Sequence, residues 1–262
     1  MKPSKFKLTH LMIGLFAVLA LTQSRVLWAQ TMTNLGTLGG TSSIAYGVSS
    51  DGSVIVGQSQ TAGNAANVAF KYTGGVMSSL GTLGGLYSYA LATSADGSVI
   101  VGSSNFAPGN LASVAFKYIG GVMSSLGTLG GVSSYAQAVS ADGTVIVGYS
   151  YMTGDLIDHA FKYSGGSMTD LGTLGGSSSF ANGISADGSV IVGYSYKTGD
   201  GTGNYHAFKY IGSTMTDLGT LGGTSSSAFG VSADGSVIVG DSSITGNSAN
   251  MPLNISAQRW LT

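Results

Sequence analysis

The sequence predicts an all-β fold, a five-bladed β-propeller built from four-stranded antiparallel blades. Three observations predict it. The hexapeptide LGTLGG begins at Leu35 and returns at Leu80, Leu126, Leu171 and Leu218, at intervals of 45 to 47 residues. Each interval holds four short segments typical of β-strands, which is the size of one propeller blade. The first and last units are incomplete in complementary ways, as a closed ring would require.

The first two strands of each unit are predicted from a turn sequence that recurs between them in all five units. A serine-rich stretch and the pattern Ala-x-x-Val/Ile-Ser form the first expected strand. The motif DGSVIVG follows at Asp51, Asp96, Asp142, Asp187 and Asp234, with Thr144 replacing Ser in the third copy. Asp-Gly between two β-type runs indicates a hairpin, because Gly accepts positive φ at little cost. The run VIV lacks polar alternation, which predicts a strand covered on both faces.

The remaining two strands follow a variable polar loop. The segment AFKY, with Phe70, Phe116, Phe161 and Phe208, is the expected third strand, and Gly-Gly after it marks a second tight turn. MSSLGTL or MTDLGTL is the expected fourth strand. LGTLGG then leads from the outer strand of one blade to the inner strand of the next. The 43 glycines and many Ser, Thr and Val residues disfavour helix.

The ring is expected to close by pairing of its N- and C-terminal strands. After the leader, the chain opens with TMTNLGTL, a fourth strand without preceding partners. It ends in ISAQRWLT, in which Ala257, Arg259 and Trp260 stand in for Ala, Lys and Tyr of AFKY. A right-handed β-solenoid is the alternative fold. Its parallel strands, however, cannot be joined by a two-residue hairpin.

Residues 1–29 are predicted to be a signal peptide. Lys2, Lys5 and Lys7 precede the apolar run LMIGLFAVLALT, and we expect cleavage after Ala29. A spanning helix needs roughly 20 apolar residues, which neither this run nor any later one provides. Residues 30–262 are therefore expected to form a single repeat domain of five units without an integral membrane segment. Such a protein is exported, to the periplasm or as a secreted, extracellular protein.

Composition argues against nucleic-acid binding, against stabilisation by disulfides and against disorder. The mature chain keeps six basic residues against 11 acidic ones, all Asp, which gives a formal charge of −5. Scattered lysines on an acidic chain provide no footprint for nucleic acid. The chain contains no cysteine, so no disulfide stabilises the fold even though export permits one. Apolar residues make up 43% of the sequence, which argues against disorder.

The repeat resembles the bacterial extracellular HAF repeat, named after its His-Ala-Phe signature. HAFKY occurs at His159 and His206, beside LGTLGG and SADGSVIVG, and the resemblance covers about residues 31 to 262. Val68, Val114 and Ser256 stand at the signature histidine position in the other units. The resemblance implies an exported protein built of repeats, and it brings no catalytic residues with it.

No catalytic residue, metal site or cofactor is predicted. His159 and His206 occupy a column that holds Val or Ser in other units, so we interpret them as ordinary strand residues. The five turn aspartates are expected to bond their own backbone amides and to point away from one another around a ring. The loop TGDGTGN has one carboxylate, Asp200, where a calcium loop of the EF-hand type uses several. No serine has a His and Asp partner implied by spacing.

The variable segments between VIVG and AFKY are the candidate binding surface. In a propeller these loops should gather with the LGG passages on one rim, as recognition surfaces commonly do. The candidate ligand-binding residues at or near them are Tyr149, Tyr151, Tyr194, Tyr196, Tyr205, Asp155 and Asp200. The tyrosines are expected either to stack on sugars or contact a protein, or to pack between blades.

Three functions are open on this evidence. The first is a non-catalytic binding module that recognises a carbohydrate or a protein through the variable rim. The second is a purely structural envelope or matrix repeat protein without a discrete ligand. The third and least favoured is a glycan-active hydrolase that uses loop aspartates such as Asp155 and Asp200. The first is preferred because the loops diverge while the framework repeats.

Overall fold

The computed structural model describes residues 31–107, 112–198, 204–246 and 250–256. It divides the chain into two units, Met1–Asn34 and Leu35–Thr262. The predicted signal peptide, Asp200 and the residues Ala257, Arg259 and Trp260 lie outside the described residues. The second unit carries every described strand, and the following description concerns that unit.

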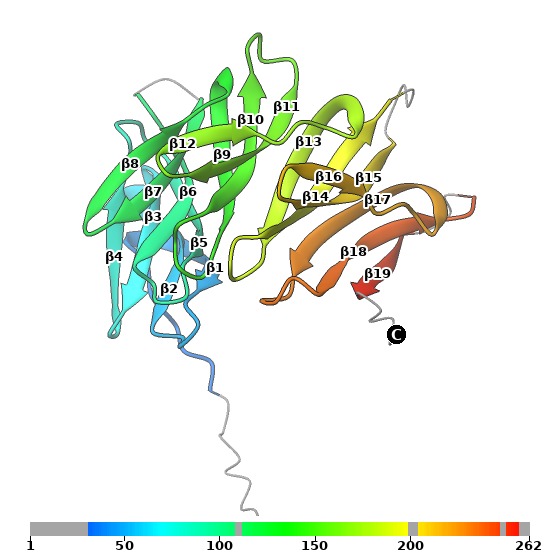
Figure 1. Ribbon diagram of the computed structural model, residues 1–262. Coiled ribbons are helices and arrows are strands. Elements are labelled where there is room, and N and C mark those ends of the chain that lie inside the picture. Colours follow the sequence, from blue (N-terminus) through cyan, green and yellow to red (C-terminus); the bar gives the residue numbers. More distant parts are fainter. Residues whose placement is uncertain (1–30, 108–111, 199–203, 247–249, 257–262) are drawn as a thin grey trace, which may run out of the picture. The chain divides into compact units, whose positions relative to one another are not determined.

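The second unit consists of five antiparallel sheets that follow one another in chain order (Figure 1). Sheet 1 contains β1 (Gly39–Val48), β2 (Val54–Thr61), β3 (Asn67–Thr73) and β4 (Val76–Gly81). Sheet 2 contains β5 (Ser88–Thr93), β6 (Val99–Asn105), β7 (Ser113–Ile119) and β8 (Val122–Gly127). Sheet 3 contains β9 (Gly130–Val139), β10 (Ile146–Met152), β11 (Asp158–Ser164) and β12 (Ser167–Asp170). Sheet 4 contains β13 (Gly175–Ile184), β14 (Val190–Lys197), β15 (Tyr205–Ile211) and β16 (Thr214–Asp217). Sheet 5 contains β17 (Gly222–Val231), β18 (Val237–Ile244) and β19 (Asn250–Ser256).

The predicted order of strands is confirmed in the first four sheets. Each is a meander in which neighbours in sequence pair antiparallel, and LGTLGG leads from the fourth strand of one sheet to the first strand of the next. All named strands pair antiparallel, which excludes the solenoid alternative for the described residues. The Gly-Gly turns have two residues, as with Gly74 and Gly75, whose φ values are 59° and 85°. Positive φ at both positions is the signature of a type I′ hairpin.

The Asp-Gly turns are longer than a two-residue hairpin. Between β1 and β2, the connection runs from Ser49 to Ser53, and the Ser49 amide donates to the Val54 carbonyl at 2.9 Å. Asp51 accepts a hydrogen bond from the Ser49 hydroxyl at 2.7 Å and from the Ser53 amide at 3.0 Å. The same arrangement recurs in all five units, so the aspartate closes the turn as the sequence predicted.

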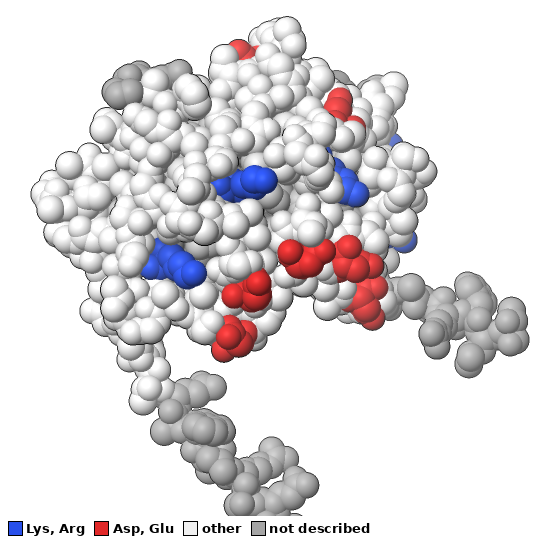
Figure 2. All heavy atoms as spheres, turned by 60° about the vertical axis from the view of Figure 1, so that its left-hand side comes forward, with Lys and Arg blue, Asp and Glu red and all other residues white. Residues whose placement is uncertain are grey.

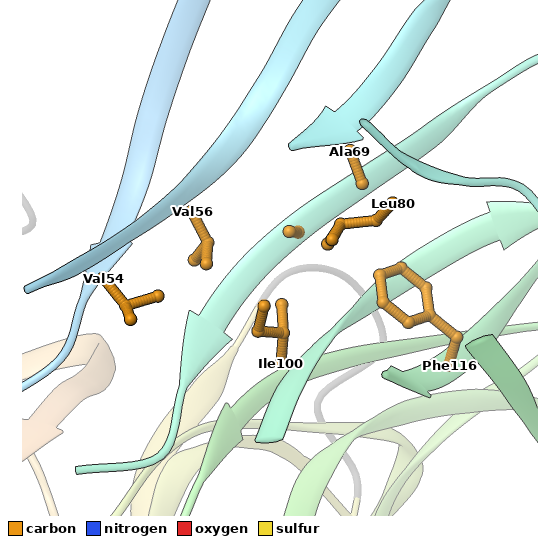
Figure 3. Packing of buried hydrophobic residues seen from close by; sticks show 7 residues of the cluster. Val54, Val56, Ala69, Leu80, Ile100 and Phe116 are labelled. Atoms are coloured by element: carbon orange, nitrogen blue, oxygen red, sulfur yellow. The ribbon is translucent and has the colours of Figure 1, made fainter. Parts of the chain in front are cut away.

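The core lies between neighbouring sheets. In the first cluster, Val54, Val56 and Ala69 of sheet 1 pack against Ile100 and Phe116 of sheet 2 (Figure 3). The equivalent clusters join sheets 2 and 3, sheets 3 and 4, and sheets 4 and 5. Burying one Val, Ile or Phe side chain contributes roughly 1.5–3 kcal/mol, so each interface supplies a substantial part of the stability.

Two sets of hydrogen bonds tie the sheets together. At one end, successive Asp-Gly turns are linked by backbone bonds of 2.9–3.0 Å, beginning with the Ser50 amide on the Ala95 carbonyl and ending with the Ala186 amide on the Ala233 carbonyl. In the middle of each interface, an alanine amide donates to a serine hydroxyl of the next sheet. Ala69 donates to Ser88 at 2.8 Å, and the other interfaces repeat this bond.

The predicted closure is not found in the described residues. Among the strands that the structure describes, β19 pairs with β18 only, and residues 31–37 form no strand, so no strand pairing closes the five sheets there. The physical reason is that no short turn connects β19 to the N-terminal segment. Every other fourth strand follows its third strand after a tight turn, so that pairing costs little loop entropy, whereas the N-terminal segment has no such local connection to β19.

The predicted position of the last third strand is also wrong. β19 begins at Asn250, and Leu253 lies opposite Gly240, where the other units place the Phe of AFKY opposite Gly. Met251, not Ser256, therefore holds the signature histidine position, opposite Ser242. The connection after β18 is short, so Pro252 and Leu253, and not Ala257 and the residues after it, pair with Asp241 and Gly240 of β18. Pro252 is tolerated because the missing amide faces the open edge of the sheet.

Candidate functional site

The variable loops meet the LGG passages at one end of the sheets, as predicted. Isolated parallel bridges join Leu38 to Thr61, Leu129 to Met152, Leu174 to Lys197 and Leu221 to Ile244. Each bridge connects the leucine of a passage to the last residue of the second strand of the same unit, within the variable segment. This rim therefore has a fixed backbone beneath loops that differ from unit to unit.

A continuous row of aromatic side chains crosses sheets 3 and 4 near this rim. Tyr135 stacks on Tyr149 at 4.9 Å between ring centroids, and Tyr149 meets Phe180 of the next sheet edge-on at 5.0 Å. Phe180 stacks on Tyr194 at 4.8 Å. Tyr205 continues the row, 5.2 Å from Tyr194 and 5.9 Å from Tyr196. We call these six residues the aromatic row.

The row is built from cross-strand pairs. Tyr149 lies directly opposite Tyr135, and Tyr194 lies opposite Phe180, so each pair shares one face of its sheet. Aromatic pairs of this geometry contribute about 0.5–1.5 kcal/mol beyond the area they bury. The row is only half-buried, so its rings stabilise the sheets and still reach solvent. Tyr149 packs against Phe180 of the next sheet, in line with the expected packing between blades. Contact of these tyrosines with a sugar or a protein stays a prediction.

Asp158 places a carboxylate beside the row. It lies opposite Tyr151 in the register of β10 and β11, and its Oδ1 atom is buried without a hydrogen-bond partner among the described residues. Burial raises the pKa of Asp158, and the neighbouring His159 partly opposes this. An unsatisfied buried acceptor costs about 1–3 kcal/mol, so its retention needs an explanation such as a ligand group that donates to it.

The tyrosine hydroxyls near Asp158 stay protonated at neutral pH. Burial raises the pKa of Tyr149 to about 12, helped by the charges of Tyr135 and Asp158. The pKa of Tyr151 is raised chiefly by the Asp158 carboxylate. Burial raises the pKa of Tyr194 as well. These phenols therefore act as neutral hydrogen-bond donors and acceptors.

The two predicted loop aspartates differ from the tyrosines. Asp155 has a φ of 55°, and its Oδ1 accepts a hydrogen bond of 2.8 Å from the Val132 amide. Asn64 does the same in unit 1, with a φ of 57° and a bond of 3.0 Å from the Thr41 amide. Asp155 thus fastens its loop to the LGG passage. Asp200 lies outside the described residues.

Sequence reasoning missed Tyr135, Phe180 and the significance of Asp158 for this surface. A signal for the first two was present. Aligning the units places Tyr135 and Phe180 in one column with Ile44, Tyr89 and Ser227, on the first strand just before the invariant alanine. Aromatic residues in this column and in the Tyr149 column coincide in units 3 and 4 alone, which would have indicated cross-strand aromatic pairs.

The histidines are paired with aspartates. His159 Nδ1 lies 2.8 Å from Asp170 Oδ2, and His206 Nδ1 lies 2.8 Å from Asp217 Oδ1. Lys197 Nζ adds a contact of 2.9 Å to Asp217 Oδ2. Burial tends to raise the pKa of Asp217, but hydrogen bonds from Lys197, the Gly219 amide and His206 outweigh it and lower the pKa. These pairs join the third strand to the end of the fourth.

Charge is sparse elsewhere. On the face shown in Figure 2, the basic side chains lie apart from one another and acidic groups gather along one edge. The described part of the chain contains no group of three or more His, Asp or Glu side chains that could hold a metal ion. Nor does any helix within the described ranges reach the length and apolar character needed to cross a bilayer.

Known structures share this fold. Over 82% of the chain, it is similar to TolB from Acinetobacter baumannii (16% identity, 52% of that chain, TM-score 0.53) and to a putative TolB from Agrobacterium tumefaciens (14% identity, 76% of that chain, TM-score 0.57). A structure from a study of two prolyl endopeptidases matches equally far (13% identity, 34% of that chain, TM-score 0.56). No family model matches the sequence, and neither does any curated protein.

The five sheets are therefore the blades of a TolB-like β-propeller fold. The chain spans about half the length of the Acinetobacter protein and about a third of the endopeptidase structure. At these identities the likeness concerns the fold alone. Function has to be argued from the rim and its side chains.

Proposed function

We propose that this chain is an exported, non-catalytic binding module of the HAF-repeat type, which recognises a glycan or a protein through the rim of blades 3 and 4. The observation that carries the proposal is the aromatic row beside Asp158, whose buried Oδ1 has no hydrogen-bond partner among the described residues. Export follows from the N-terminal sequence, to the periplasm or to the medium.

The chemistry of the rim fits recognition. Tyrosine combines a large rigid ring with a polar hydroxyl, and it orders at little entropic cost on binding. The hydroxyls of Tyr149, Tyr151 and Tyr194 offer donors, and the buried Oδ1 of Asp158 offers an acceptor that has no donor within the described ranges. A ligand rich in hydroxyl or amide groups would satisfy both, which is the reason for naming glycans and proteins.

Catalysis has less support. A glycosidase needs two carboxyl groups roughly 5–10 Å apart across a cleft, one of them free to exchange a proton. Asp155 is engaged by the Val132 amide, and the turn aspartates are engaged by their own turns. We therefore propose that the rim binds without transforming its ligand.

A binding screen tests the proposal. The mature chain, residues 30–262, is applied to a glycan array and to a panel of extracted envelope proteins. We expect retained ligands whose binding falls at least tenfold in Tyr151→Ala and Tyr196→Ala. Tyr46→Ala is the matched control, because Tyr46 is an exposed tyrosine of sheet 1 outside the row. Binding unaffected by the two rim variants, or no binding at all, would instead favour a structural envelope or matrix role.

A further inference from the structure

An apolar hollow adjoins β19 in sheet 5. Among the described strands, β19 pairs with β18 only, whereas the third strands of the other four sheets have a neighbour on each side. The hollow has a volume of about 130 Å³, and its apolar side chains are those of Leu218, Leu221, Leu253 and Ile255. An edge strand is a template for a further strand, and a hollow of this kind selects one with an apolar side chain.

In sheets 2, 3 and 4, the equivalent position holds a tyrosine–methionine pair. The tyrosine of the third strand lies opposite the methionine of the fourth, and both pack against the cluster shared with the preceding sheet. These pairs are Tyr118–Met123, Tyr163–Met168 and Tyr210–Met215. Among the described residues, the cluster between sheets 4 and 5 includes Leu253 and Ile255 but no aromatic or methionine side chain. The side chain of a fourth strand is what this cluster lacks.

The register of β19 identifies the residues that correspond to a fourth strand. Ile255 lies opposite Ile238, as Tyr163 lies opposite Ile146. Counting on from this position, residues 257 and 258 correspond to the Gly-Gly turn, and residues 259–262, RWLT, correspond to SMTD of β12. Trp260 thus stands in the methionine column. Residues 257–262 lie outside the described part of the chain.

The sizes of the side chains compensate one another. Sheet 5 has Leu253 and Ile255 where the other sheets have Phe and Tyr, so its third strand fills less volume. Trp260, in contrast, is larger than the methionine that it replaces. Exchanges that conserve total volume are the ones that a packed interface tolerates best. The hollow therefore matches an indole ring.

A second pair of columns follows the repeat as well. The third-strand residue two positions before the Phe varies together with the fourth-strand residue that faces this Phe. The pairs in units 1 to 4 are Val68–Ser79, Val114–Ser125, His159–Asp170 and His206–Asp217. Unit 5 has Met251 in the first column, and Thr262 falls in the second. An apolar residue is again combined with a small hydroxyl residue, as in units 1 and 2.

Pro252 is compatible with a fourth strand. It stands at the alanine position of the repeat, opposite Asp241. At this position in sheet 3, the Ala160 amide donates to Ser179 of the next sheet at 2.8 Å, while its carbonyl accepts from the Leu171 amide of the fourth-strand segment at 2.9 Å. Proline lacks only the amide, so it keeps the group that the fourth-strand segment uses.

We propose that residues 259–262 form the fourth strand of sheet 5 and that Trp260 fills the hollow. The register of β11 and β12 then sets Trp260 opposite Ile255 and Leu261 opposite Asn254. Residues 257 and 258, Ala-Gln, replace Gly-Gly in the turn, which is unfavourable because neither residue prefers positive φ. The roughly 150–250 Å² that a tryptophan buries offsets this cost. The strand covers an edge that would otherwise pair with other chains, and it is independent of the ligand-binding role proposed above.

Tryptophan fluorescence tests the burial. In a chain of residues 30–262, Trp260 is the only tryptophan. We expect its emission to lie at shorter wavelength than in the urea-unfolded chain, and acrylamide to quench it much less, because leucine and isoleucine side chains surround the indole. Emission and quenching equal to those of the unfolded chain would overturn the proposal.

A cysteine pair tests the register, since the chain has no native cysteine. Asn254→Cys/Leu261→Cys places two thiols at directly opposite positions, with Cβ atoms about 4.5–5.5 Å apart, so mild oxidation should give a disulfide within one chain. Asn250→Cys/Leu261→Cys is the matched control and should stay reduced, because residue 250 lies roughly 13 Å further along β19. Adding Trp260→Asp to the first pair should abolish its disulfide, since a carboxylate does not enter the apolar hollow. Trp260→Met, the residue of the other units, should preserve it.

The other outcomes of the cysteine experiment contradict the proposal. Equal yields from the two pairs would mean that residues 257–262 reach β19 without a fixed register. A disulfide that survives Trp260→Asp would mean that the hollow does not hold the indole. A product that forms only between chains, with a yield that rises with concentration, would assign this segment to the edge of another copy. If neither pair is oxidised, these residues do not lie along β19.

Discussion

Each of the five repeated aspartates closes one turn and takes part in nothing else that the structure describes. In the second unit, hydrogen bonds from the Ser94 hydroxyl, the Ser98 amide and the Ser98 hydroxyl lower the pKa of Asp96 to about 2. The pKa values of the equivalent aspartates are lowered for the same reasons. At the residue scale, a polar residue that recurs in every unit is explained by local hydrogen bonding, and the sequence was sufficient to predict it.

These turns make the stability of the fold sensitive to acid. The carboxyl groups have a lower pKa in the folded chain than the ordinary value of 3.8, so their contribution is present above about pH 4. It is lost as the pH falls towards 2, when the folded carboxyl groups take up protons. Melting temperatures measured between pH 5 and pH 2 should fall steeply. Asp96→Asn keeps the acceptor oxygen but does not titrate, so its fall should be smaller. Identical profiles for the two proteins would contradict this account.

The histidine–aspartate pairs show that two positions of the repeat change together, which cannot be seen from either position alone. Sequence analysis treated His159 and His206 as ordinary strand residues because other units hold Val. The structure shows that the fourth-strand residue changes with them, from Ser79 or Ser125 to Asp170 or Asp217. The covariation was visible in the repeats, but it acquires meaning only once the two columns are known to face each other.

A double-mutant cycle tests this pairing. His159→Val and Asp170→Ser should each destabilise the fold by about 1 kcal/mol, because each leaves a polar group without its partner. The double variant recreates the pair found in units 1 and 2, so its cost should be less than the sum by about 1 kcal/mol. Urea unfolding of the four proteins gives the coupling. Strict additivity would show that the contact contributes nothing.

At the scale of the strand, the glycine of VIVG sets how closely two strands approach. A Cβ atom at Gly148 would lie 1.9 Å from the Tyr135 carbonyl oxygen of the first strand, and Gly57, Gly102, Gly193 and Gly240 are equally crowded. The register shifts at this level, where the first strand of each sheet bulges. The sequence predicted the strands on either side, but the bulge and hence the reason for the glycine needed coordinates.

Sheet 5 offers a matched pair of glycines to test this. Gly240→Ala places a Cβ 1.8 Å from the Ser227 carbonyl oxygen, whereas Gly230→Ala places one 3.5 Å from a Val239 methyl group, an ordinary contact. We expect Gly240→Ala to lower the free energy of unfolding by about 3 kcal/mol, the upper range for overpacking, and Gly230→Ala to change it by less than about 1 kcal/mol. Equal effects in urea titrations would refute the steric explanation.

For the whole molecule, the sequence predicted what is local and repeated, and failed where the repeat ends. Strand order, the Gly-Gly turns and the meeting of loops and LGG passages at one rim all follow from short-range patterns. The closure joins the two ends of the chain, and no turn motif specifies it. The last third strand was misplaced because ISAQRWLT resembles AFKY in composition, while the loop after β18 determines which residues reach the ladder. The aromatic row needed the pairing of columns across strands.

The terminal sheet 5 packs against a neighbouring sheet on one face only. The free energy of local unfolding should therefore differ along the chain. The second valine of VIV is fully buried in the first four units, at Val56, Val101, Val147 and Val192. In the fifth unit the equivalent Val239 is 47% exposed. In a repeat protein each unit is stabilised mainly by its neighbours, so a terminal unit with one packed face opens most readily. Hydrogen exchange should therefore protect amides of β10 and β14 most and those of β18 and β19 least. Protection of β18 equal to that of β10 would mean that the outer face of sheet 5 is covered in solution. Sheet 5 would then be as stable as the sheets that have a neighbour on both faces.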